Sequence, residues 1–225
     1  MESFATIRAR AAERKGGEDV IEGLMPDTLP DAELAGIPDD RWLAGMTRAV
    51  FNSGFNWKVI EAKWDGFEAA FHGFDPGRVA FMDDDRIDAL TKNPDIVRHA
   101  GKITATRENA VFVTGLIREH GSAGAFFANW PATDQVGLME VLKKRGSRLG
   151  GNTGQYFLRF ARKDSFVLGG DVVKALIKWG AVEKNPTSKR DLAAVQAAFN
   201  TWQAESGRTM AHISRTLAMS VGEED

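Results

Sequence analysis

The chain has 225 residues, a hydrophobic fraction of 43% and a formal net charge of -2 at pH 7. This size suits one large domain or two interlocked lobes around a core, and the charge excludes a polycation that binds nucleic acid indiscriminately. No cysteine is present and the four histidines have no metal-ligand spacing, so neither a metal nor another cofactor is expected. No apolar run reaches the length of a membrane span, and we expect a cytoplasmic monomer.

Residues 1–40 form the first distinct segment of the chain. Its second half, "MPDTLPDAELAGIPDD", holds three prolines among several acidic residues, and this composition favours an irregular structure. We expect residues 1–40 to be an arm packed on the body of the protein. Residues 41–225 are then a single domain built from two lobes.

The stretch "WKVIEAKWDGFEAAF" has apolar residues at spacings of three and four. They are Trp57, Ile60, Trp64, Phe67 and Phe71. This spacing predicts one amphipathic helix with a buried stripe, which ends near "FHGFDP".

The rest of the chain also carries helix signals and few strand signals. Asp75 followed by Pro76 predicts a capped short helix, and "MDDDRIDAL" is an acidic helix start. Further helices are predicted at 101–119, 135–145, 153–163, 171–179, 188–205 and 209–219, several of which end at a glycine. The predicted fold class is therefore all-α.

A basic, glycine-rich hairpin is predicted between two of these helices. The segment Lys143–Lys163 has seven basic residues and no acidic one, and "GSRLGGNTG" separates a helix ending near Gly146 from one starting near Asn152. Glycines allow close approach of a phosphate, and a helix N-terminus offers free N–H groups to an anion. The pattern indicates DNA-backbone binding, or else an ordinary turn between two solvated basic helices.

Three segments together resemble a known family. They are "WKVIEAKWDGFEAAFHGFDP" (57–76), "IVRHAGKI" (96–103) and "LKKRGSRLGGNTGQY" (142–156). The chain resembles the helix-hairpin-helix DNA glycosylases, and among them the DNA-3-methyladenine glycosylase I family, over about residues 45–173. The resemblance implies an all-α fold with a hairpin that grips DNA and two helical lobes around a base-binding cleft.

The resemblance also implies which parts of the chain contact DNA. The hairpin at about 146–153 would hold the phosphate backbone of damaged double-stranded DNA. The residues expected to contact DNA there are Arg148, Gly150, Gly151, Asn152 and Thr153. Lys102, in the "IVRHAGKI" block, is a further candidate for DNA contact, with a packing or polar-network role as the alternative.

The loop "SGFNW" matches the family segment that faces the flipped nucleotide. Gly54 and Phe55 would fill the gap left in the duplex, and Trp57 would stack on the extracted base. Read without the family, Trp57 is the first residue of a core stripe. Asn52 and Asn56 could read a base edge through their amide groups, or could cap and turn the backbone before the helix.

The chain departs from the family at several positions. The family's zinc site needs cysteine ligands that this chain lacks, and the N-terminal motif resembling HDxEWGVP is missing. Ala49 stands where the family has its base-reading glutamate. Asn152 stands near the place of the Schiff-base lysine of bifunctional relatives, so a monofunctional enzyme is expected.

Two carboxylates are candidates for catalysis. Hydrolysis of an N-glycosidic bond passes through an oxocarbenium-like state, which a nearby carboxylate can stabilise while it orients water. Asp171 lies close to the place of the superfamily's catalytic aspartate, and it could equally be a helix N-cap. Glu61 lies one helical turn beyond Trp57 on the same side, and it could equally be a solvated flank residue.

We therefore expect a DNA glycosylase of base excision repair that flips and hydrolytically removes alkylated bases such as 3-methyladenine. Loss of the family glutamate and zinc site leaves a second hypothesis, a non-catalytic protein that binds damaged or unusually structured DNA. A third hypothesis is a scaffold adapted to bind a protein or small ligand, although the basic hairpin argues against it.

Overall fold

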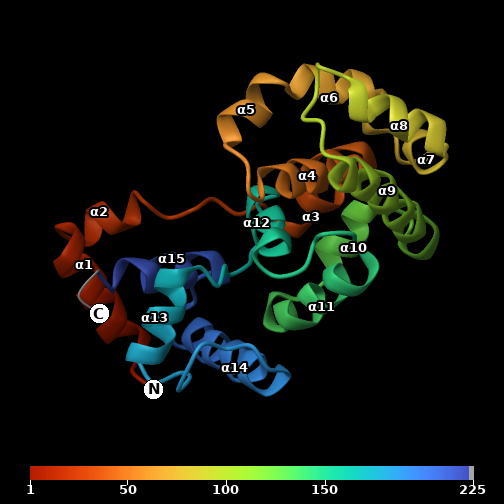
Figure 1. Cartoon of the computed structure of the whole chain (residues 1–225). Helices are drawn as coiled ribbons and strands as arrows, with labels where there is room; N and C mark the ends of the chain where they lie inside the picture. Colours follow the sequence, from red (N-terminus) through yellow and green to blue (C-terminus); the bar gives the residue numbers. More distant parts are fainter. Residues whose placement is uncertain (223–225) are drawn as a thin grey trace. The chain divides into compact units, whose positions relative to one another are not determined.

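The computed structural model of the chain describes residues 1–222, and its regular elements in that range are all helices (Figure 1). The helices, in chain order, are α1 (Phe4–Lys15), α2 (Glu18–Glu22), α3 (Asp31–Ala35), α4 (Asp39–Asn52), α5 (Trp57–Ala62), α6 (Trp64–Ala70), the 3-10 helix η1 (His72–Phe74), α7 (Pro76–Ala80), α8 (Asp84–Lys92), α9 (Ala100–His120), α10 (Ala123–Asn129), the 3-10 helix η2 (Ala132–Asp134), α11 (Gln135–Arg145), α12 (Asn152–Phe160), α13 (Gly170–Lys178), α14 (Lys189–Ser206) and α15 (Met210–Met219). The all-α prediction is confirmed. None of these helices is long and apolar enough to cross a membrane.

The predicted helix boundaries agree with the structure wherever a capping residue marks them. Asp75 accepts a hydrogen bond from the backbone N–H of Arg78 at 2.8 Å, and Pro76 opens α7 as expected. Asp83 caps α8 in the same way, and the backbone N–H of Gly121 closes α9. These signals are local, so the sequence alone reveals them.

The N-terminal segment is more regular than its composition predicts. It contains α1, α2 and α3, and α1 begins after Ser3, whose hydroxyl accepts a hydrogen bond from the N–H of Thr6 at 3.3 Å. Helices α4 and α10 were also not predicted. Pro30 and Pro38 lie just before α3 and α4, where proline permits a helix to start because the first N–H groups need no intrahelical acceptor.

The predicted single helix from Trp57 to Phe71 is two helices. Lys63, with φ -106° and ψ 7°, separates α5 from α6. Ile60, Phe67 and Phe71 are buried as expected, but the side chain of Trp57 is 61% exposed. Apolar spacing identifies the inner face of a helix, but it does not tell how far the core extends along that face.

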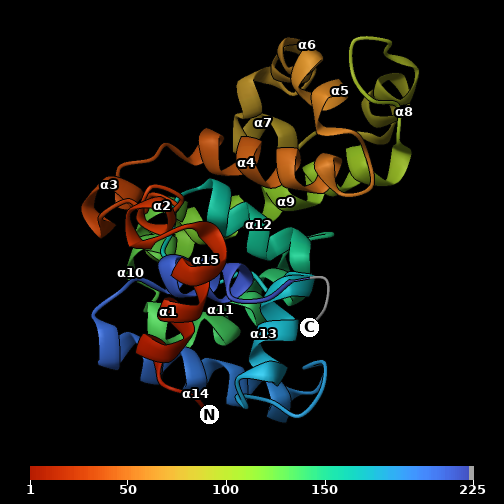
Figure 2. The same ribbon diagram turned by 90° about the vertical axis from the view of Figure 1, so that its left-hand side faces the viewer.

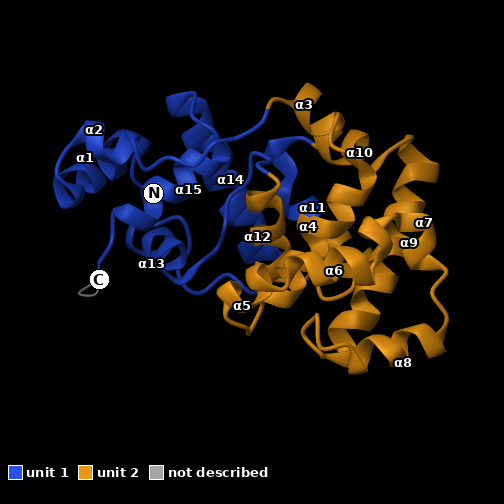
Figure 3. Cartoon of the chain, turned by 90° about the horizontal axis from the view of Figure 1, so that it is seen from above, with its two compact units in different colours: residues 1–29, 131–138, 162–225 blue, residues 30–130, 139–161 orange. Residues whose placement is uncertain are grey.

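The chain folds into two compact units (Figure 3). Unit 1 contains residues 1–29, 131–138 and 162 onward, and unit 2 contains residues 30–130 and 139–161. The expected arm of residues 1–40 is therefore divided between the units. In unit 1, α15 packs against α1, α13 and α14, and the Phe166 and Phe199 rings stack with centroids 4.3 Å apart.

Unit 2 is built around its longest helix, α9. This helix packs against α4, α7, α8 and α10, and α4 also packs against α12 (Figure 2). The aromatic core between these helices includes Trp42 and Phe127, stacked at 4.4 Å, and Phe157, whose ring is edge-on to both. This packing holds α4 between α9 and α12.

Candidate active site

Unit 2 contains a cavity of about 920 Å³ between α4, α5, the start of α6 and α12. Its lining residues are Ile37, Arg41, Trp42, Ala44, Gly45, Arg48, Ala49, Asn52, Ser53, Trp57, Glu61, Trp64, Asn152, Thr153, Tyr156, Phe157, Phe160 and Ala161. Most of this surface is apolar or aromatic, with a few polar groups, which is the usual composition of a small-molecule site.

One face of α4 forms the back of the cavity. Trp42, Gly45, Ala49 and Asn52 line it at spacings of three and four residues, which places them on one side of a helix. At Gly45 a β-carbon would lie 3.5 Å from the Phe157 ring, an ordinary van der Waals contact, so α4 and α12 are closely packed at this point. Ala49, at the position of the family's glutamate, adds only a methyl group.

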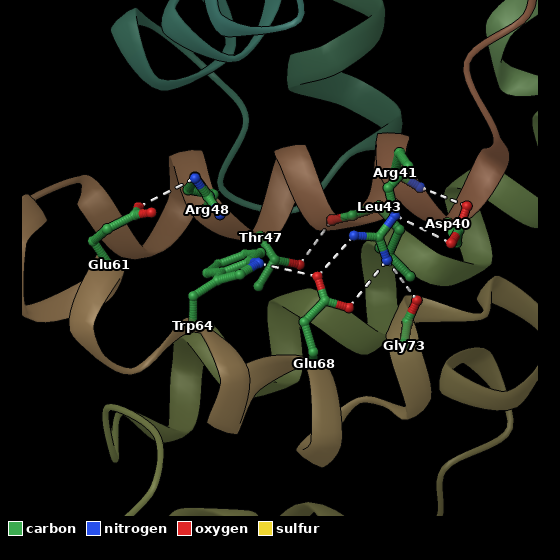
Figure 4. Close-up of polar contacts among 9 residues, drawn as sticks. All are labelled: Asp40, Arg41, Leu43, Thr47, Arg48, Glu61, Trp64, Glu68 and Gly73. Carbon is green, nitrogen blue, oxygen red and sulfur yellow. Dashed lines mark hydrogen bonds and ion pairs between the residues drawn. The ribbon is translucent and has the colours of Figure 1, made fainter.

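A row of polar side chains runs along the cavity and behind it (Figure 4). Glu61 accepts a hydrogen bond from Arg48 at 3.2 Å, and the guanidinium carbon of Arg48 lies 4.0 Å from the centroid of the Trp64 ring. The indole N–H of Trp64 donates to Glu68 at 3.0 Å. Glu68 in turn accepts two hydrogen bonds from Arg41, at 2.7 and 3.0 Å.

The Arg41–Glu68 pair has the most hydrogen bonds in this row. Arg41 also donates to the Asp40 carboxylate and to the carbonyl of Gly73, so every part of its guanidinium has an acceptor. The hydrogen bonds between these two side chains lower the pKa of Glu68 and raise the pKa of Arg41 above its ordinary value. Both groups therefore stay ionised at neutral pH and hold α4 to α6.

Aromatic side chains form the open side of the cavity. Trp57 is the first residue of α5 and is largely exposed, so the structure does not support the core reading of this residue. Tyr156 and Phe160 lie one turn apart on α12, are both exposed, and stack with ring centroids 5.9 Å apart. Three exposed aromatic rings around one cavity provide flat apolar surfaces for a ligand.

Two polar atoms at the cavity have no hydrogen-bond partner within residues 1–222. They are the buried indole N–H of Trp42 and the side-chain oxygen of Asn52. Asn52 was one of the expected base-reading residues. Asn56 was the other, but its side-chain oxygen accepts a hydrogen bond from the N–H of Lys58 at 3.0 Å and caps α5, as the alternative reading proposed.

The loop after α4 contains Gly54 and Phe55, the expected gap-filling residues. Gly54 has a φ of +80°, a conformation that favours glycine, and both residues are exposed beside the cavity-lining Ser53. The ring of Phe55 covers the amine of Lys102, whose Nζ lies 4.5 Å from the ring centroid. The loop is thus fixed at its base and accessible at its tip.

Lys102 does not reach the surface as the expected DNA contact requires. Its side chain is 5% exposed, and its amine donates to the carbonyls of Val50 at 2.8 Å, Phe51 at 3.3 Å and Ser53. Burial lowers the pKa of this amine, and the nearby charge of Arg148 lowers it further. Lys102 satisfies the last carbonyls of α4 and anchors the following loop.

The predicted hairpin between α11 and α12 is present, and glycine is required within it. A β-carbon on Gly154 would lie 2.2 Å from the carbonyl oxygen of Leu149. Gly151 precedes α12 with a φ of +59°, and no side chain caps the first N–H groups of this helix. These N–H groups lie at the N-terminal end of α12, where Asn152 and Thr153 line the cavity.

Asn109 of α9 holds this hairpin in place. Its amide accepts a hydrogen bond from the N–H of Ser147 at 2.7 Å and donates to the carbonyl of Ser147 at 3.1 Å. Arg148, with a φ of +58°, donates from Nε to the carbonyl of Gly101 at 3.0 Å. These long-range contacts attach the first half of the hairpin to α9.

The basic run around the hairpin is partly neutralised. Arg145 forms two 2.9 Å hydrogen bonds with Glu119, and Lys144 forms an ion pair with Glu140 at 2.7 Å. Lys143 and Arg148 are exposed and form no ion pair with any described residue. The positive charge available near the hairpin is therefore smaller than the sequence suggests.

Asp171 lies in unit 1, in the first turn of α13, and is exposed. The N-cap position belongs to Gly169, so Asp171 is not the side-chain cap that the alternative reading proposed. A carboxylate in a first turn interacts favourably with the helix dipole. Among residues 1–222 no group of three or more histidine, aspartate or glutamate side chains could hold a metal ion.

Arg41, Arg48, Glu68 and Asn109 are among the site residues that the sequence did not single out. The first two lie on α4, a helix that was not predicted although "DDRWLAGMTRAVF" begins with two acidic residues and has apolar residues at helical spacing. That signal could have located the wall of the cavity. The partners of Glu68 and Asn109 lie 27 and 38 residues away, beyond the range of local patterns.

Solved structures with this arrangement of helices define the class of protein. A mutant of 3-methyladenine DNA glycosylase I from Staphylococcus aureus aligns with a TM-score of 0.50 and 26% identity, over 55% of this chain and 77% of that one. A second structure of this glycosylase, solved to explain 3-methyladenine recognition, aligns with a TM-score of 0.51 and 24% identity, over 61% of this chain and 79% of that one. The fold is that of the helix-hairpin-helix DNA glycosylases.

The sequence comparisons point to the same class. The methyladenine glycosylase family model matches residues 38–144. DNA-3-methyladenine glycosylase 1 of Escherichia coli (strain K12) is 38% identical over 58 residues, and DNA-3-methyladenine glycosylase of Haemophilus influenzae is 36% identical over 58 residues. Each match covers 26% of this chain and 31% of the relative, so the chain spans about a third of the length of these curated relatives.

Proposed function

We propose that the protein is a monofunctional DNA glycosylase that flips alkylated bases such as 3-methyladenine out of double-stranded DNA and hydrolyses their N-glycosidic bond. The observation that carries this proposal is the cavity of unit 2, which combines an exposed Trp57 with the carboxylate of Glu61. Its volume of about 920 Å³ is ample for a nucleobase. The similar proteins, which are 3-methyladenine DNA glycosylases, supply the substrate class.

Trp57 is suited to hold a flipped base. An extracted base loses its stacking neighbours and needs a flat apolar surface in their place. The indole of Trp57 stands exposed at the first position of α5, beside the cavity. An alkylated base that carries positive charge gains additional attraction from the electron-rich face of an indole.

Glu61 is the carboxylate that we assign to catalysis. Cleavage of the N-glycosidic bond develops positive charge on the sugar, which an ionised carboxylate at the cavity wall stabilises while it orients a water molecule for attack. Arg48 fixes one oxygen of Glu61, and the other remains available. Asp171 of unit 1 stays the second candidate for this role.

The hairpin is suited to bind the phosphate backbone beside the flipped nucleotide. The uncapped N–H groups of α12 and the exposed side chains of Lys143 and Arg148 attract phosphate without reading sequence. Asn152 and Thr153 begin this helix and also line the cavity, so phosphate binding there would hold the nucleotide at the cavity. With Asn152 in place of a Schiff-base lysine, the reaction stops at an abasic site.

The direct test is base release. The protein is incubated with methylated duplex DNA, and released bases are identified by mass spectrometry. We expect 3-methyladenine or another alkylated base to appear in proportion to enzyme and time. Binding to methylated or abasic duplex without any released base would reject the enzyme and favour the non-catalytic DNA-binding protein, while no binding at low salt would reject both.

A further inference from the structure

Arg48 is a cation at the cavity wall that keeps hydrogen-bond donors free. Its guanidinium carbon lies 4.0 Å from the centroid of the Trp64 ring, and one N–H group donates to Glu61 at 3.2 Å. Within residues 1–222 Arg48 forms this one hydrogen bond, although a guanidinium carries five N–H groups. Stacking on a fixed ring holds the plane of these donors at the cavity.

The neighbouring Arg41 shows the opposite situation. Its N–H groups are taken up by Glu68, by Asp40 and by the carbonyl of Gly73. Arg41 therefore has a structural role. Its link to Arg48 is indirect, because its partner Glu68 accepts a hydrogen bond from Trp64, and Arg48 lies over the Trp64 ring. The chain of contacts orients Arg48 without occupying its remaining donors.

The neighbour of Arg48 in the chain offers no competition for its free donors. Ala49 lines the cavity and contributes no polar group. A ligand that offers acceptors to this wall would satisfy groups that are otherwise unpaired. A ligand that presents an amino group to Arg48 would place donor against donor, which leaves both without a partner.

We infer that Arg48 makes this cavity selective for bases with a keto oxygen, such as 6-oxopurines, over the corresponding 6-aminopurines. This inference rests on the proposed function, because it assumes that the cavity takes a base. Arginine pairs well with the oxygen and adjacent ring nitrogen of guanine-type bases, and a wrong base costs such a site binding energy. Among alkylated bases, those derived from guanine would then be preferred to 3-methyladenine.

Hypoxanthine and adenine are the probes that isolate this effect, because they share the purine ring and differ in the keto or amino group at position 6. Their binding to the full chain is followed by tryptophan fluorescence or calorimetry. We expect hypoxanthine to bind about tenfold more tightly than adenine, in line with one good arginine contact. Arg48→Met, whose side chain can still lie over Trp64, should abolish this preference, and Arg48→Lys should retain part of it.

Arg118→Met is the matched control, because Arg118 belongs to unit 2 but is exposed on α9 and is not among the cavity residues. It should keep the wild-type ratio, and circular dichroism should be unchanged in every variant. Equal or tighter binding of adenine, an unchanged ratio in Arg48→Met, or no binding of either base would overturn the inference. Base release from methylated DNA is measured separately. An active glycosylase without keto preference would refute only this inference. Keto preference without base release would refute only the proposed catalysis.

Discussion

Trp57 is the residue at which two readings of the sequence lead to different functions. Its spacing to Ile60 is that of a buried stripe, yet its exposed indole at the start of α5 borders the cavity. A sequence gives the face on which a residue lies, but whether another element covers that face depends on distant parts of the chain. The expectation that Trp57 faces a ligand came from the resemblance to a family, because the periodicity of the helix indicated a buried residue.

Replacement of Trp57 by alanine should therefore affect function far more than folding. We expect single-turnover base release to fall by about ten- to a hundredfold, since stacking of a base on an aromatic ring contributes roughly 1–3 kcal/mol. The free energy of unfolding in urea should change by no more than about 0.5 kcal/mol, as for other exposed positions. A large loss of stability with unchanged base release would restore the core reading.

Glu68 should make the stability of unit 2 depend on pH. Arg41 lowers the pKa of this carboxyl below its ordinary value of 4.5, so its contribution is fully present above pH 4.5 and is lost as the pH falls through the lowered value. Glu68→Gln should destabilise the protein at pH 7, and the difference from the wild type should shrink as the pH falls below 4.5. Urea unfolding of both proteins across this range gives the comparison, and parallel curves would show that Glu68 has no such role.

At the scale of elements, the sequence located most helices after residue 75 because each has a cap, a glycine stop or a regular stripe. It missed α4, although this helix forms the back of the cavity, and it joined α5 to α6. The two errors have different causes. The break at Lys63 has no proline or glycine to mark it, and α4 begins after a proline that was taken as a sign of irregular structure.

The hairpin offers a test at this scale, because Gly154 at the start of α12 and Gly170 at the start of α13 differ in their surroundings. A methyl group at Gly154 would collide with the Leu149 carbonyl, whereas one at Gly170 of α13 would meet nothing within 4 Å. Gly154→Ala should weaken DNA binding at least tenfold by displacing the N-terminus of α12. Gly170→Ala should preserve DNA binding and favour helix formation by up to about 1 kcal/mol.

Fluorescence anisotropy with a labelled duplex at low salt measures both variants, and circular dichroism reports their folding. Equal DNA affinity of the two alanine variants would mean that the hairpin geometry is unimportant for binding.

Over the whole molecule, length and composition allowed one large domain or two interlocked lobes, but they did not predict which segments form each unit. Unit 1 joins the first 29 residues to two later segments of the chain, and no local signal marks such long-range connections. The net charge of -2 also hides the local positive charge of Lys143 and Arg148, which are exposed beside the hairpin. The net charge of the chain is therefore a poor guide to the local charge that DNA would meet at the hairpin.

The most direct measurement is single-turnover base release from methylated duplex DNA by the wild type, Glu61→Gln and Asp171→Asn. We predict that the wild type releases an alkylated base, that Glu61→Gln lowers the rate at least a hundredfold with DNA affinity unchanged, and that Asp171→Asn remains within a few-fold of the wild type. Full activity of Glu61→Gln, or loss of activity in Asp171→Asn alone, would contradict the assignment of catalysis to the cavity carboxylate.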